Sequence, residues 1–132
     1  MRPQPMIAVA DVVASSRWYQ RLLDCKSGHG GAEYEQLVDA GGTLLLQLHD
    51  WDAHEHPLMG DPAVKPLGNG VLLWFETREF DAAVARARAM SAEIRDGPLV
   101  NPAAKHREIW VRDPDGYVVV IATAYGDVGS TP

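Results

Sequence analysis

The sequence has few features of membrane-spanning or secreted proteins. No segment approaches the roughly 20 consecutive apolar residues of a membrane span, and the N-terminal residues lack the apolar stretch of a signal peptide. It contains a single cysteine, Cys25, so no internal disulfide can form, which suits a reducing compartment. We therefore expect a protein that stays in the cytoplasm and does not bind membranes.

Basic residues are also scarce. The chain has 12 lysines and arginines against 18 aspartates and glutamates, its formal net charge is −6, and its basic residues form no run. Surfaces that bind nucleic-acid phosphates need clustered positive charge. The sequence therefore predicts no nucleic-acid partner, and favours a neutral, cationic or apolar one.

Familiar catalytic motifs are missing as well. The serines, at positions 15, 16, 27, 91 and 130, belong to no recognisable triad, and no glycine-rich phosphate loop of the Walker type occurs. Hydrolase and kinase functions are therefore not indicated.

What is present is a pattern of short strands and two helices. With 132 residues, of which 46% are hydrophobic, the chain can bury one core and most simply forms a single domain over residues 1–132. Asp11 is placed to cap an amphipathic helix, and Thr77 to cap a second one. The expected elements of the first half are strand 6–10, helix 12–23, a weak strand at 25–27, and strands 33–39 and 43–49. Those of the second half are strand 70–77, helix 78–91, an extended piece at 92–96, and strands 106–112 and 117–124.

The order of elements repeats. Asp39–Gly42 and Asp113–Gly116 supply the same turn between the same two strands, 74 positions apart (113 minus 39). A polar stretch rich in proline and glycine, 51–69, connects the halves. We predict an α+β fold of two βαβββ modules, about 4–50 and 70–125, that form a curved mixed sheet with a concave ligand cavity.

Several phrases resemble one known family. DVVASSRWYQRLLD resembles the first-helix signature of the glyoxalase/bleomycin resistance/dioxygenase (vicinal oxygen chelate) superfamily. FETREFDAAVARARAMSAEI, GPLVNP and HREIWVRDPDGYVVVIA resemble its C-terminal module, in the style of its metal-free bleomycin-resistance-type members. The match covers about residues 4–125. The chain departs from the family pattern at Asp24 and Ser91, where glycine is common, and at Lys105–His106, where Trp-Gly is common.

The resemblance also bears on metal binding, because the metal-dependent members of the family place four ligands on their concave face. Carried over, those positions are Gln4, Leu46, Gly70 or Leu72, and Val120, and only Gln4 carries a donor atom. Glyoxalase and extradiol-dioxygenase chemistry needs an ion as a Lewis acid. The resemblance thus predicts neither a metal nor another cofactor.

A relocated metal site is the alternative. His49, His54 and His56 give the spacing H-x4-H-x-H, and imidazole is a suitable ligand. This spacing matches no rigid helical pair, so a solvated loop is favoured over a metal site.

The predicted cavity wall follows from strand alternation and from the resemblance. If Val120 faces the cavity, alternation and the repeat place Leu46 and Leu48 there as well. By resemblance to extradiol dioxygenases, Trp110 faces the same cavity, and alternation adds Glu108. The full set of predicted ligand-binding residues is Tyr34, Gln36, Leu46, Leu72, Trp74, Glu108, Trp110 and Val120.

Two tryptophans and a carboxylate suit a planar aromatic or cationic ligand. The competing explanation is that the tryptophans fill the core and that Glu108 forms an ion pair with Lys105, Arg107 or Arg112. We expect a protein that sequesters an aromatic or cationic compound, as drug-binding resistance members of the family do. The alternatives are a lyase-like or dioxygenase-like enzyme with a non-standard site and a protein–protein interaction module. The family's habit of pairing modules between chains implies a homodimer.

Overall fold

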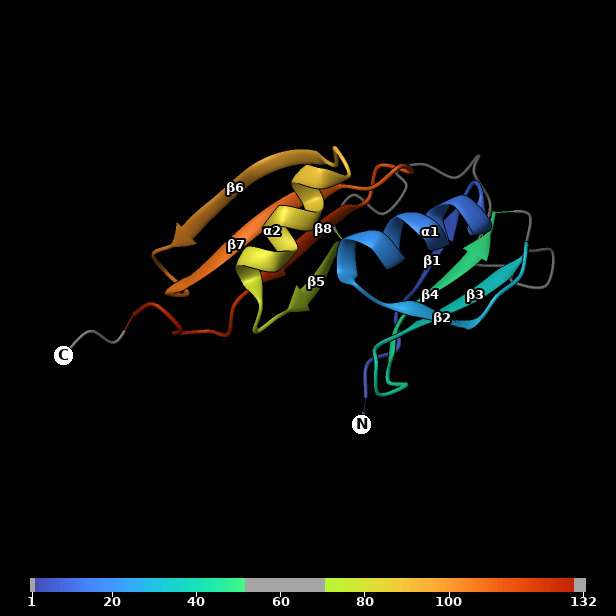
Figure 1. Cartoon of the computed structure of the whole chain (residues 1–132), viewed down its shortest axis with the longest axis horizontal. Helices are drawn as coiled ribbons and strands as arrows, with labels where there is room; N and C mark the ends of the chain where they lie inside the picture. The colour runs from blue at the N-terminus through green and yellow to red at the C-terminus, as the bar shows by residue number, and fades with distance from the viewer. Residues whose placement is uncertain (1, 52–70, 130–132) are drawn as a thin grey trace. The chain divides into compact units, whose positions relative to one another are not determined.

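The computed structural model describes residues 2–51 and 71–129 (Figure 1). The chain divides into two compact units, Met1–Gly68 and Asn69–Pro132. Within the described residues, each unit contains one helix and one four-stranded mixed sheet, in the order β-α-β-β-β. The α+β class and the duplicated module are thereby confirmed. The predicted single domain, the curvature and the concave cavity stay predictions.

Unit 1 is built on the sheet β1-β4-β3-β2, in which only the β1–β4 pair is parallel. Its elements are β1 (Met6–Val9), α1 (Val12–Leu23), β2 (Lys26–His29), β3 (Tyr34–Val38) and β4 (Leu44–Asp50). Asp11 caps α1 as predicted, because its carboxylate accepts a hydrogen bond from the Ala14 amide at 2.9 Å. Tyr19 and Leu22 of α1 are fully buried, and α1 packs on β3 and β4.

A buried carboxylate also ties α1 to its sheet. Glu35 of β3 is 3% exposed and accepts hydrogen bonds from the hydroxyls of Ser16 on α1, at 2.8 Å, and Ser27 on β2, at 2.9 Å. Glu35 therefore points toward the helix, and this identifies the helix-covered face of the unit 1 sheet.

Unit 2 repeats this topology with the sheet β5-β8-β7-β6, again with one parallel pair, β5–β8. Its elements are β5 (Leu72–Glu76), α2 (Phe80–Ala89), β6 (Glu93–Asn101), β7 (His106–Arg112) and β8 (Val118–Ala122). In Figure 1, α2 lies along this sheet, and Phe80, Ala83, Val84 and Ala87 are its buried residues.

Three local predictions need correction. β6 runs to Asn101 instead of ending near Asp96, with register irregularities around Pro98, as is common for proline in an edge strand. α2 begins at Phe80 instead of Arg78. Thr77 does not cap it in the predicted way, because its hydroxyl accepts from the Glu79 amide just before the helix. The predicted connection 51–69 lies, apart from Trp51, outside the described residues, as do His54 and His56. Neither helix in the described ranges has the length and hydropathy to span a bilayer.

The two residues that replace the family's glycines, Asp24 and Ser91, have strained backbone conformations. Asp24, the C-cap of α1, and Ser91, just after α2, both have φ of 53°, in the left-handed region that favours glycine. A side chain there costs roughly 1–2 kcal/mol, less for aspartate.

We predict that Asp24→Gly and Ser91→Gly each raise the free energy of unfolding by about 0.5–1 kcal/mol, because the left-handed strain is removed. Urea denaturation measures the change. The matched control is Ser91→Ala, which keeps a Cβ in the same conformation and should give no gain. Equal stabilisation by glycine and alanine would contradict the strain explanation.

Candidate functional site

One face of the unit 2 sheet is not covered by α2, and most of the predicted site residues lie on it. Trp74 of β5 and Trp110 of β7 are both in register with Val120 of the strand between them, β8. Because paired residues share a face and side chains alternate, Leu72 and Glu108 lie on the same side. We call this surface, formed by Leu72, Trp74, His106, Glu108, Trp110 and Val120, the open face of unit 2.

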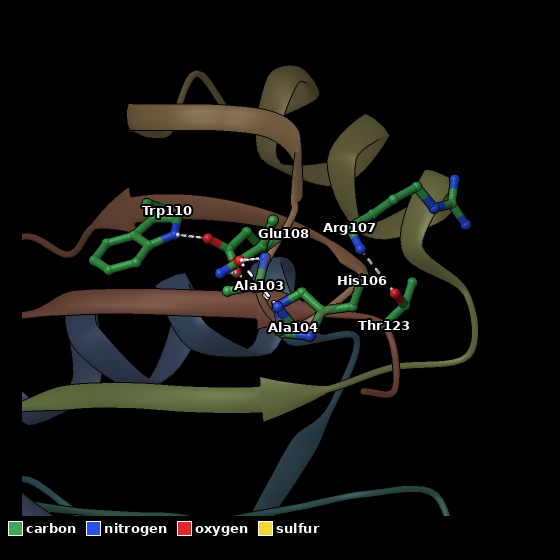
Figure 2. A network of polar contacts seen from close by, with 8 residues as sticks. Ala103, Ala104, His106, Arg107, Glu108, Trp110 and Thr123 are labelled. Carbon is green, nitrogen blue, oxygen red and sulfur yellow. Dashed lines mark hydrogen bonds and ion pairs between the residues drawn. The ribbon is translucent and has the colours of Figure 1, made fainter. Parts of the chain in front are cut away.

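Glu108 is the centre of a hydrogen-bond network on this face. Its side chain is almost fully buried, and three donors converge on it. Trp110 Nε1 donates to Oε1 at 3.0 Å, whereas His106 Nε2, at 2.6 Å, and Asn101 Nδ2, at 3.3 Å, approach Oε2. Figure 2 shows Glu108 between Trp110 and His106, with Arg107 extending away from them.

This network corrects the ion-pair alternative. Neither Lys105, Arg107 nor Arg112 is a partner of Glu108. The Arg107 guanidinium instead pairs with Asp81 at 3.1 Å and lies 5.0 Å from the centre of the Phe80 ring, on the helix-covered side. Arg112 lies 4.0 Å from Glu93.

The donors also determine the charge of Glu108. Burial alone raises the pKa of the Glu108 carboxyl, but the hydrogen bonds from His106, Trp110 and Asn101, together with the charge of His106, outweigh burial and leave the pKa below its usual value of 4.5. At neutral pH the group is thus a carboxylate that accepts from all three neighbours.

The tryptophans form an aromatic corner. The Trp74 and Trp110 rings are 6.5 Å apart at an interplanar angle of 82°, an edge-to-face arrangement. Trp74 also lies 5.7 Å from the His106 ring. The side chain of Trp74 is 45% exposed, and Trp110 is partly exposed. Full burial in a core, the competing explanation for these residues, does not describe Trp74.

His106 is the site residue that the sequence reasoning missed. It appeared only as a departure from the family's Trp-Gly pair, yet it is 6% exposed and holds the shortest contact to Glu108. The available signal was the spacing His106-x-Glu108-x-Trp110, which puts all three side chains on one face of a single strand.

The corresponding face of unit 1 has a different chemistry. Tyr34 donates from its hydroxyl to Gln47 Oε1 at 2.6 Å and accepts from Gln36 Nε2 at 2.9 Å. The Gln47 amide nitrogen donates to the Gln4 carbonyl at 2.9 Å. Tyr34 and Gln36, both predicted site residues, thus belong to a polar network on the side of β3 opposite Glu35.

The predicted position of Leu46 is wrong. Leu46 is fully buried opposite Leu37 on the helix-covered face, as is Leu48 opposite Glu35. The physical reason is a β-bulge: Val38 pairs with Leu44 but Leu37 pairs with Leu46, so Leu45 is an extra residue. One extra residue exchanges the two faces for the rest of the strand. Gln47, in register with Met6 and Gln36, therefore occupies the place that Val120 has in unit 2.

The corrected positions do not fit a divalent metal. They are Gln4, Gln47, Leu72 and Val120, of which the last two have no donor atom and the first two are neutral amides. The Gln47 carbonyl oxygen already accepts from Tyr34. Within the described ranges, no three histidine, cysteine or acidic side chains are grouped as metal ligands. His49 packs near Tyr34, at 6.2 Å between ring centres, and its predicted partners His54 and His56 lie outside the described residues.

The remaining candidate nucleophile is Cys25. Burial raises the pKa of its thiol to about 11, helped by the nearby charges of Asp24 and Glu35 and opposed by a backbone hydrogen bond. At neutral pH the group is therefore a thiol and not the reactive thiolate.

Comparison with known proteins places the chain in a family. The model of the Glyoxalase/Bleomycin resistance protein/Dioxygenase superfamily matches residues 3–121. The chain belongs to this superfamily, as its sequence motifs indicated. No curated protein is significantly similar to it.

Solved structures share the fold at low sequence identity. A protein of unknown function from Agrobacterium tumefaciens str. C58 has a TM-score of 0.74 and 21% identity, over 94% of each chain. A glyoxalase/bleomycin resistance protein/dioxygenase family enzyme from Burkholderia phytofirmans PsJN has a TM-score of 0.73 and 21% identity, over 92% of this chain and 96% of its own. TioX from Micromonospora sp. ML1 has a TM-score of 0.68 and 18% identity, over 93% and 98%.

The register correction makes a testable prediction about stability. Leu46→Ala should lower the free energy of unfolding by about 2–5 kcal/mol, because it empties a fully buried position. Gln47→Ala, the matched neighbour, should cost about 1 kcal/mol, the scale of its hydrogen bonds. Urea denaturation of the two variants distinguishes the faces, and a reversed order would show that the bulge is misplaced.

A second prediction concerns Glu108→Gln. All three neighbours are donors, and a glutamine must direct its own NH2 group at one of them, so the variant should lose about 1–3 kcal/mol at neutral pH. Because the folded pKa of Glu108 is lowered, the wild-type advantage should be complete above about pH 4.5 and shrink as pH falls through the folded pKa. Denaturation at a series of pH values measures this, and an advantage that grows toward acid would contradict the carboxylate assignment.

Proposed function

We propose that this protein binds a planar aromatic or cationic small molecule on the open face of unit 2 and sequesters it without a metal. The observation that carries the proposal is the aromatic corner, in which the half-exposed Trp74 stands edge-to-face with Trp110. Exposed indole surface beside a second indole can contact a planar ligand on two sides.

The charge of the site favours a cation. The Glu108 carboxylate lies at the N–H edge of the Trp110 indole and accepts a hydrogen bond from it. A cation over an indole face gains energy from the ring quadrupole, and a buried negative charge nearby adds to this attraction. Glu108 acts here through its field and by holding Trp110, since its oxygens already accept three hydrogen bonds.

The other predicted residues differ in how they relate to this proposal. Leu72 is exposed and supplies apolar surface next to Trp74, whereas Val120 is fully buried and lies in register between the two tryptophans. Gln36 and Tyr34 lie in unit 1, where they bond each other and Gln47, and they are not part of the site proposed on unit 2. Leu46 has no place in the proposal, because it is buried beneath α1.

An enzyme is the second candidate, and the contact between His106 and Glu108 is what favours it. An imidazole held by a carboxylate is a common arrangement in proton transfer. A sequestering protein returns its ligand unchanged, whereas an enzyme converts it. We further propose a cytoplasmic homodimer. The dimer is suggested by the family's habit of pairing modules between chains, and the cytoplasmic location by the sequence composition. Analytical sedimentation tests the dimer.

The binding proposal is tested with 10-methylacridinium, a planar cation. It should quench tryptophan emission of the wild type, and Trp74→Ala should weaken binding by about 1–3 kcal/mol, the scale of a lost aromatic contact with its buried area. The free energy of unfolding should fall by only about 1 kcal/mol, because Trp74 is half exposed.

Tyr125→Ala is the matched control, since Tyr125 is an exposed aromatic residue of the same unit, 81% accessible, outside the open face. It should leave binding unchanged, as should treatment of the protein with EDTA. Loss of binding on chelation, or equal losses in both variants, would refute the proposed site. Mass spectrometry of the recovered probe separates a binder from an enzyme.

A further inference from the structure

His106 has one ring nitrogen that the network does not use. Nε2 approaches the Glu108 carboxylate at 2.6 Å, and the His106 ring lies 5.7 Å from that of Trp74. Among buried side-chain nitrogen and oxygen atoms of the described residues, Arg107 Nε alone lacks a hydrogen-bond partner. The unpartnered Nδ1 of His106 is therefore not sealed off, and solvent or a ligand can reach it.

The neighbour of Nε2 determines which nitrogen carries the proton. A carboxylate oxygen that makes a 2.6 Å contact needs a donor, so Nε2 holds the hydrogen. In the neutral ring, Nδ1 then presents a lone pair. Glu108 thus fixes the tautomer of His106 and turns its open edge into a hydrogen-bond acceptor.

We infer that His106 Nδ1 is the specificity-determining contact of the open face, and that it selects planar compounds carrying an N–H or O–H donor on the ring edge. This inference rests on the proposed function. Trp74 provides the surface for stacking, and its ring lies 5.7 Å from that of His106. A ligand stacked on Trp74 therefore brings its edge next to Nδ1. Other planar molecules stack equally well but leave this acceptor without a partner, which costs affinity.

Two planar cations of similar size test the inference. 9-Aminoacridine has N–H donors on its ring edge, whereas 10-methylacridinium has none. At about pH 8, the wild type should bind 9-aminoacridine tighter by about tenfold, the scale of one hydrogen bond to a charged donor.

His106→Phe should abolish this preference with little effect on 10-methylacridinium. Phenylalanine keeps a flat ring at this position but has no acceptor atom. His29→Phe, in β2 of unit 1, is the matched control and should retain the tenfold preference.

The outcomes separate the two proposals. Equal binding of both cations by the wild type, or equal weakening of both by His106→Phe, overturns the role of Nδ1 and leaves the stacking site intact. Failure of both cations to bind overturns the stacking site together with the inference. Since the comparison in the wild type needs no variant, it holds even if His106→Phe unfolds.

Discussion

In the described part of each unit, a single helix serves a four-stranded sheet, and this constraint governs the rest of the structure. One helix covers one face, so the strands direct mostly apolar side chains to the helix and leave the opposite side for other chemistry. The helix-covered faces are alike in their buried aliphatic residues, Leu37, Leu46 and Leu48 in unit 1 and Ile109, Val111 and Val119 in unit 2, with the Glu35 carboxylate as the exception. The units differ more on their other faces.

Those faces show how duplicated modules diverge without losing stability. In unit 2, Glu108 requires three donors, and each donor is thereby held in place. In unit 1, the related position is Tyr34, 74 residues earlier, and it bonds two glutamines. Neither network contributes to the apolar core, so each was free to change while the helix-covered faces stayed alike.

Much of this was accessible from the sequence, because period-two alternation and the repeated turn depend on local patterns. The helices and the strand β7 follow from such patterns. The shared face of Trp74, Glu108, Trp110 and Val120 also required the family resemblance, which placed Val120 and Trp110, and alternation then added the other two. The role of His106 could not be predicted, because a histidine at a strand end shows its role only when Glu108 and Trp74 are brought beside it. The face of Leu46 could not be predicted either, because the bulge depends on how β4 leaves its turn and pairs with β3, and a run of leucines does not reveal this.

The bulge at Leu45 has a consequence for the history and engineering of this chain. Counting from the turn glycines aligns Leu46 with Val120, whereas the paired strands align Gln47 with it. An alignment of the halves without a gap therefore compares residues from opposite surfaces. A deletion at Leu45 would remove the extra residue and restore equal lengths, while the later side chains of β4 keep their present sides, with the leucines toward α1 and Gln47 and His49 away from it. Insertion of one further residue in the middle of β4 would instead turn the rest of the strand over, exposing leucines and burying polar side chains.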